Sequence, residues 1–206
     1  MPVPKRRDHT EKMQRITLAS RMVAHEVRLS TIRRWCGVSD NRVRELYRSW
    51  AHEKGIRYAV RHRGPTPRQP ALFLRSAQVR SEAAAFAGLC CLFEIFPKRP
   101  LANPRRELPS LQRGEQLLLA YEMFLSLVGS SVISLEQAML LLTAVTQGTQ
   151  LRLGHCVHCG AAIVFDPGAA QRRCCGRCDH KAPAEEDLAP RRVPQDLQEA
   201  VQHSLF

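Results

Sequence analysis

Residues 29–48 read LSTIRRWCGVSDNRVRELYR, which is the pattern of two short helices joined by a tight turn. Ile32, Trp35 and Cys36 recur at three- and four-residue steps, so they would face inward from the first helix. Gly37 follows them and can adopt the left-handed backbone conformation that a sharp turn requires. The stretch therefore predicts a helix-turn-helix, whose second helix enters the major groove of DNA in many proteins.

The second helix of this pair would have one buried face and one polar face. Val43, Leu46 and Tyr47 would form the buried face, each about one turn from the next. Arginine and asparagine side chains can pair bidentately with guanine and adenine edges. The residues expected to cap this helix or to contact DNA are Ser39, Asn41, Arg42, Arg44 and Arg48. A chance pair of amphipathic helices is the alternative interpretation.

The positive charge of the chain is concentrated around this stretch. The 206 residues have a formal net charge of +12, and residues 1–70 hold 17 Lys or Arg and 6 Asp or Glu, a balance of +11. Such asymmetry predicts an anionic partner for the first third of the chain. No apolar run reaches the roughly 18–20 residues of a membrane span, so double-stranded DNA is a better candidate than a membrane. The alternative is that these charges form a solvated basic surface without a specific partner.

Four cysteines near the C-terminus have the spacing of a metal site. Cys156 and Cys159 form one C-x-x-C pair, and Cys175 and Cys178 form a second pair after fifteen intervening residues. Two such pairs, with their sulfurs about 4 Å apart, suit a tetrahedral zinc ion with Zn–S bonds of about 2.3 Å. The sequence therefore predicts one structural Zn²⁺ per chain. Because Cys174 adjoins Cys175, either of the two could be the third ligand.

The surroundings of these cysteines favour a structural role over catalysis. A catalytic zinc needs an open position and a nearby carboxylate, and no Asp or Glu adjoins Cys156 or Cys159. The N-terminus lacks the apolar segment of a secretory signal, which predicts a reducing, cytoplasmic location. Three other cysteines fall within apolar helical patterns and are expected to be buried: Cys36, Cys90 and Cys91. We expect a protein without catalytic activity.

The whole chain is expected to be mostly α-helical. Residues 1–10 would form a disordered basic tail, and Ala161–Phe165 a short strand. Further helices are expected over 11–28, 72–96, 114–127 and 134–146, the last with a capping box from Ser134 to Gln137. We divide the chain into four parts: a basic tail with a helix-turn-helix-like region (1–56), a helical assembly region (57–153), a zinc module (154–180) and a C-terminal tail (181–206). A short helix is expected within the C-terminal tail, at 194–204.

In this order of parts and in local sequence, the chain resembles the FlhC family, the zinc-containing subunit of the bacterial flagellar transcriptional activator. The resemblance covers roughly residues 13–180, and the cysteine block is its most specific part. The second cysteine pair is one residue closer to the first than in familiar members, which leaves open a divergent paralogue with other promoters. The matching stretches are Leu29–Tyr47, Ala120–Leu125, Gln137–Leu151 and the two C-x-x-C pairs.

The resemblance implies a DNA-binding activator subunit of flagellar and motility promoters. It also implies assembly with a small helical FlhD-like partner into a hetero-oligomer, action through RNA polymerase, and zinc at Cys156, Cys159, Cys175 and Cys178. The competing hypothesis is a zinc-ribbon adaptor that assembles proteins through its apolar helices, with the basic third merely solubilising the chain. A zinc-dependent nucleic-acid enzyme is a weaker alternative, because the carboxylate that it needs does not adjoin the cysteines.

Overall fold

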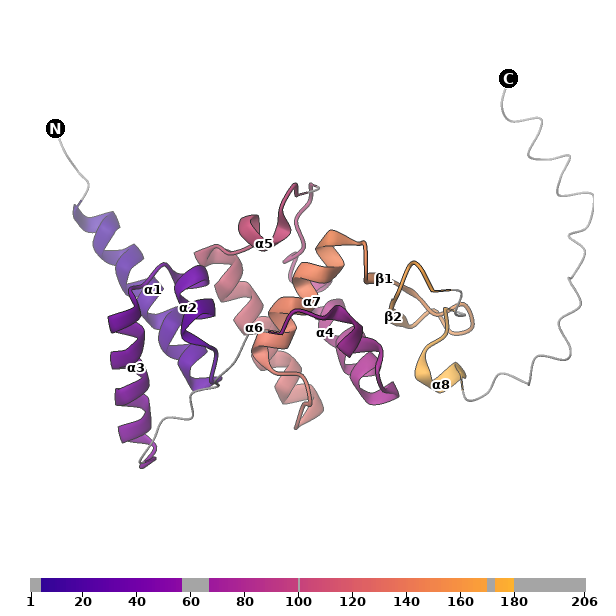
Figure 1. Ribbon diagram of the computed structural model, residues 1–206, viewed down its shortest axis with the longest axis horizontal. Coiled ribbons are helices and arrows are strands. Elements are labelled where there is room, and N and C mark those ends of the chain that lie inside the picture. The colour runs from indigo at the N-terminus through magenta and orange to yellow at the C-terminus, as the bar shows by residue number, and fades with distance from the viewer. Residues whose placement is uncertain (1–4, 57–66, 100, 170–172, 180–206) are drawn as a thin grey trace, which may run out of the picture.

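The computed structural model describes residues 5–56, 67–99, 101–169 and 173–179, with the side chains of 5–8 and 179 excepted. Within these residues the chain is mostly α-helical, with eight α-helices, one 3-10 helix and one two-stranded sheet. This confirms the expected fold class. The elements lie in a row, with three N-terminal helices at one end, a helical middle, and a small module with the strands at the other end (Figure 1). The expected C-terminal tail helix lies outside the described residues.

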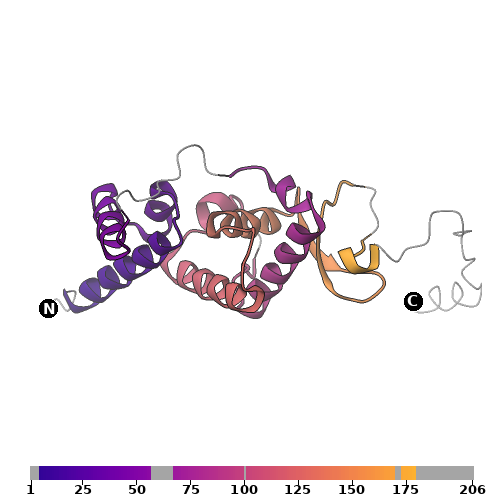
Figure 2. The same ribbon diagram turned by 90° about the horizontal axis from the view of Figure 1, so that it is seen from below.

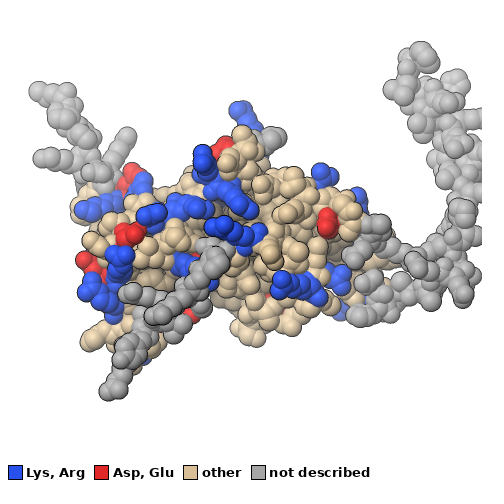
Figure 3. All heavy atoms as spheres, viewed as in Figure 1, with Lys and Arg blue, Asp and Glu red and all other residues tan. Residues whose placement is uncertain are grey.

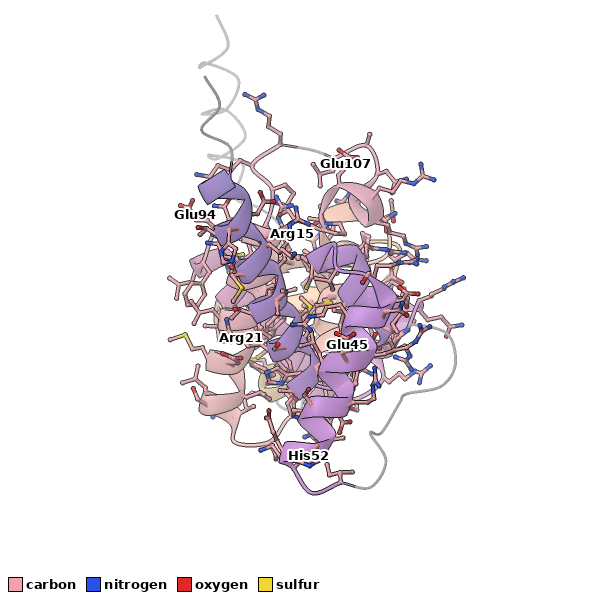
Figure 4. The ribbon with its side chains drawn as sticks, turned by 90° about the vertical axis from the view of Figure 1, so that its left-hand side faces the viewer. Arg15, Arg21, Glu45, His52, Glu94 and Glu107 are labelled. Carbon is pink, nitrogen blue, oxygen red and sulfur yellow. The ribbon has the colours of Figure 1, made fainter. Side chains whose placement is uncertain are left out.

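The N-terminal end is built from α1 (Lys5–Ala24), α2 (Leu29–Cys36) and α3 (Asp40–Glu53). Helix α1 packs against both members of the helix pair, and Figure 4 looks onto this end of the molecule with α1 and α3 in front. The expectation of a tail over residues 1–10 is wrong from Lys5 onward. No Pro or Gly occurs between Lys5 and Ala24, so nothing interrupts helical hydrogen bonding there.

The helical middle contains a 3-10 helix and four α-helices. Leu72 and its neighbours form the 3-10 helix, and Ser76 then caps a separate helix by accepting a hydrogen bond from the backbone N–H of Val79. The single helix expected over 72–96 is therefore wrong. The predicted capping box of Ser134 and Gln137 is confirmed. These elements are η1 (Pro70–Leu74), α4 (Ala77–Leu92), α5 (Pro104–Glu107), α6 (Leu111–Val128) and α7 (Leu135–Gln147).

The C-terminal module contains β1 (Arg152–His155), β2 (Ala162–Phe165) and α8 (Gly176–Asp179). The two strands are antiparallel, and Leu153 lies opposite Val164. Strand β2 confirms the strand expected at this place, whereas β1 was not predicted. The module is seated on the middle of the molecule, because β2 packs on α4 and β1 contacts α7 (Figure 2).

One hydrophobic core extends through the helix-turn-helix end and the helical middle. Its buried members run from Leu18 in α1 to Val164 in β2. Helices α1 and α6 approach each other closely at Gly114, where a Cβ atom would lie 2.8 Å from Cδ2 of Leu18. A second connection is polar: Glu136 at the start of α7 accepts hydrogen bonds from Arg28 and Thr31. The N-terminal helices are thus attached to the middle by packing and by hydrogen bonds.

Replacing Gly114 by leucine should destabilise the protein by about 1–3 kcal/mol, because overpacking in a filled core forces neighbours to move. Gly88 in α4 is a matched control, since nothing lies within 4 Å of its Cβ position. Gly88→Leu should instead raise the free energy of unfolding by about 0.5–1 kcal/mol through helix propensity. Urea unfolding of both variants measures the difference. Equal stability of the two variants would contradict the close approach of α1 and α6.

Candidate metal centre and nucleic-acid interface

The helix pair predicted from residues 29–48 is present and has the expected turn. Helix α2 ends at Gly37, whose φ of 66° and ψ of 20° are left-handed. Ile32, Trp35 and Cys36 are buried, as predicted. The Ser39 side chain then caps α3 by accepting a hydrogen bond from the backbone N–H of Arg42. These local features orient α3 relative to α2.

Helix α3 is held by its inner face. Val43 and Tyr47 are buried, and Leu46 is half-buried and packs against the same core. The Tyr47 hydroxyl donates a hydrogen bond to the backbone carbonyl of Val27, which joins α3 to the segment between α1 and α2. Because this face is fully engaged, the opposite face of α3 is directed to solvent.

The residues expected to contact DNA lie on the exposed part of α3. Asn41, Arg44 and Arg48 are exposed and form one stripe, being three and four residues apart. Arg44 Nη1 donates to Asn41 Oδ1 over 3.0 Å, which holds the two side chains beside each other. Arg42 is also exposed, next to this stripe, where it pairs with Glu45 at 2.9 Å. The structure thus brings these four side chains to one surface, with Ser39 at its N-terminal edge.

The four paired cysteines come together at the end of the C-terminal module. The sulfur atoms of Cys156, Cys159, Cys175 and Cys178 all lie within 4.8 Å of one another, and those of Cys159 and Cys175 are 3.6 Å apart. For bonds of about 2.3 Å, the edge of a ZnS₄ tetrahedron is about 3.8 Å. This donor set could therefore hold one metal ion. Cys174 is not one of the four clustered residues.

Backbone hydrogen bonds shape the two loops that carry these sulfurs. Cys156 follows β1, and its N–H donates to the carbonyl of Ala161 over 2.8 Å. Gly160 closes the first loop by donating to the carbonyl of Cys156 over 2.9 Å, with a φ of 71° that favours glycine. The Val157 N–H donates to the carbonyl of Arg173 over 2.9 Å, which ties the first loop to the second.

The electrostatics of the cluster lower the pKa of two of its thiols, Cys156 and Cys175, and raise that of Cys178. A hydrogen bond from the backbone of Cys175 is the main cause that lowers the pKa of Cys156 to about 6. Hydrogen bonding with the sulfurs of Cys159 and Cys175 raises the pKa of Cys178 to about 12. Four thiols so close together cannot all lose their protons without a compensating cation, because like charges repel. A bound dication would supply that compensation and would deprotonate all four.

Two further groups of apolar side chains are more exposed than their sequence patterns predict. Cys36 and Cys90 are buried as expected, but Cys91 is exposed, so that expectation is wrong for Cys91. Its position in α4 faces solvent because Phe86 and Cys90 occupy the core face. Helix α6 also has an apolar face that is not buried in the core. Three residues of that face are exposed: Leu119, Met123 and Leu127.

Comparisons with known proteins add no relative: no protein-family model matches the sequence, and no curated protein matches it significantly. Among the described residues, no helix combines the length and the apolar character that crossing a membrane would require.

Proposed function

We propose that this protein is a DNA-binding subunit of a transcriptional activator, without catalytic activity of its own. The observation that carries the proposal is the exposed stripe of Asn41, Arg44 and Arg48 on the second helix of a helix pair. The left-handed turn at Gly37 and the cap at Ser39 support this proposal, because helix-turn-helix proteins also join their recognition helix to the preceding helix by a tight turn. The concentration of positive charge in residues 1–70 supports a polyanionic ligand.

The cysteine cluster is proposed to bind one structural Zn²⁺ through Cys156, Cys159, Cys175 and Cys178. The support is chemical and geometric, since four thiolates complete a tetrahedron and leave no open position for a reactant. When bound, the ion would supply folding energy to a module that has only two four-residue strands and one helical turn. The module would in turn cover α4 through β2.

The partner proposed for this subunit is a small helical FlhD-like protein, together with RNA polymerase, at flagellar or motility promoters in the cytoplasm. An exposed apolar face on α6 supports a protein partner, because monomeric surfaces rarely leave apolar residues in one row. Leu119, Met123 and Leu127 are 51%, 41% and 69% exposed and lie four residues apart on this helix. The same face supports the competing proposal of an adaptor that assembles proteins without reading DNA.

The double substitution Arg44→Ala and Arg48→Ala is expected to weaken DNA binding at least tenfold, taking about 1 kcal/mol or more for each lost contact. The probe is a duplex that the wild-type protein, purified with its partner, selects from a random-sequence pool. Fluorescence anisotropy as a function of salt concentration measures the affinity. The double variant should also discriminate less between the selected duplex and a scrambled one, because contacts to base edges supply sequence specificity.

A matched control removes two arginines from the other end of the molecule, Arg152→Ala and Arg177→Ala, which are exposed residues of the C-terminal module. This control should bind the selected duplex like the wild-type protein. Equal binding by the α3 variant and the wild type would contradict the assignment of α3 as the recognition helix. Failure of the wild-type protein to select or retain any duplex, with or without partner, would favour the adaptor.

A further inference from the structure

A second group of exposed arginines surrounds a hollow between α2, α5 and α7. The hollow has a volume of about 400 Å³. Three segments far apart in sequence contribute arginines to its lining: Arg34 comes from α2, Arg68 precedes η1, and Arg105 and Arg106 belong to α5. We call the cavity lined by these four residues the arginine hollow. Its position outside α3 means that the proposed recognition helix does not account for it.

Among the described residues, no carboxylate neutralises the positive charge of the arginine hollow. All four arginines are exposed, and none forms an ion pair with another of the described residues. Glu136 lines one wall, but its carboxylate already accepts hydrogen bonds from the backbone N–H of Arg28 and the Thr31 hydroxyl, and it pairs with the Arg28 guanidinium. Four like charges around one cavity repel one another, and a bound anion would relieve that repulsion.

The arginine hollow and α3 adjoin different faces of α2. Arg33 of α2 is directed to α3, where it pairs with Asp40 at 3.5 Å, whereas its neighbour Arg34 lines the hollow. In helix-turn-helix proteins the first helix of the pair, here α2, crosses the DNA backbone. One helix diameter of about 10–12 Å corresponds to about three base pairs at 3.4 Å each. Figure 3 shows Lys and Arg side chains in a band from the α3 end toward α5.

We propose that the arginine hollow binds backbone phosphates of the duplex beside the base pairs that α3 contacts. This inference rests on the proposed DNA-binding function and adds a second contact surface, on the helical middle of the molecule. The planar guanidinium group suits the task, because its N–H donors match two phosphate oxygens at once. Arg105 and Arg106 are adjacent residues of α5 and both line the hollow, so they supply two such groups.

The test compares Arg105→Ala/Arg106→Ala with the wild-type protein on two duplexes that contain the sequence that the wild type selects. The short duplex ends at the last base pair that α3 contacts on the side of the hollow, and the long duplex has about 30 base pairs and extends past the hollow. The variant should bind the long duplex about tenfold more weakly, with a salt slope less negative by about 1.8. Its affinity for the short duplex should equal that of the wild type. Arg34→Gln is a milder second variant, expected to have a smaller effect in the same direction.

The outcomes separate this inference from the proposed function. If Arg44→Ala/Arg48→Ala weakens binding to both duplexes while the hollow variant matches the wild type on both, the inference fails and the proposed function stands. If the wild type retains neither duplex, the proposed function fails. Titration of ATP distinguishes another source of phosphate: micromolar ATP binding that the hollow variant loses, with unchanged binding of the long duplex, would overturn the inference in favour of a nucleotide site. Unchanged thermal melting shows that each variant is folded.

Discussion

Replacing Cys156 by alanine should release the bound metal and unfold the C-terminal module. Three thiolates cannot complete the tetrahedron that the four clustered sulfurs provide. Structural zinc contributes roughly 10 kcal/mol or more to the folding of small modules, which is more than two short strands can replace. Elemental analysis should give one zinc per wild-type chain and less than a tenth of that in the variant. Amide hydrogen exchange should show lost protection in β1, β2 and α8, and also in α4, against which β2 packs.

Two controls make this result specific to the cluster. Cys174→Ala removes the thiol next to Cys175 without touching the four clustered residues, and Cys91→Ala removes an exposed thiol from α4. Both variants should retain one zinc per chain and wild-type protection. Loss of zinc in Cys174→Ala would instead assign the third ligand to Cys174. A Cys156→Ala protein that contains no metal yet keeps full protection in the module would show that the metal is not structural.

Replacing Glu136 by alanine should lower the free energy of unfolding by about 3–5 kcal/mol, the usual cost of removing one partner from a buried ion pair. Glu136 is only 5% exposed. Its carboxylate accepts from the Arg28 N–H over 3.0 Å and from the Thr31 hydroxyl over 2.9 Å, and it also pairs with the Arg28 guanidinium. Without it, the Arg28 charge and the first turn of α2 lose their partners. Denaturant unfolding followed by circular dichroism measures the change.

The controls for Glu136 separate charge from hydrogen bonding and from simple truncation. Glu136→Gln keeps an acceptor of similar shape and removes the charge, so we expect a loss between those of the wild type and the alanine variant. Glu94→Ala removes an exposed carboxylate that pairs with Lys98 at 2.9 Å, and should change stability by less than about 0.5 kcal/mol. If Glu136→Ala and Glu94→Ala were equally stable, Glu136 would not anchor the helix-turn-helix to α7.

The helix-turn-helix could be predicted closely because its signals are local. A left-handed residue at Gly37 and a capping hydroxyl at Ser39 end one helix and begin the next, each through bonds within four positions. The capping box of Ser134 and Gln137 was predictable for the same reason. The C-x-x-C spacing likewise predicts a pair of sulfurs on one loop, whatever surrounds that loop.

Features that depend on distant parts of the chain were predicted less well. Cys91 belongs to an apolar pattern, but whether it is buried depends on which face of α4 meets the other helices. Strand β1 is short and contains a glycine, so its pairing partner β2 rather than its own composition makes it a strand. The arginine hollow had no sequence signal, since Arg34, Arg68 and Arg105 come from separate segments.

Local sequence patterns were enough to predict the helix pair, the polar stripe on its second helix and the two cysteine pairs. The physical reason is that caps, turns and helical faces depend on residues within about four positions of one another. Three arrangements became visible only in the folded chain: all four sulfurs lie within 4.8 Å of one another, Glu136 joins α7 to α2, and arginines from three segments surround one hollow. The residues in each of these arrangements are far apart in the sequence, so no local sequence pattern predicts that they meet. They are brought together by the way the hydrophobic core packs distant segments.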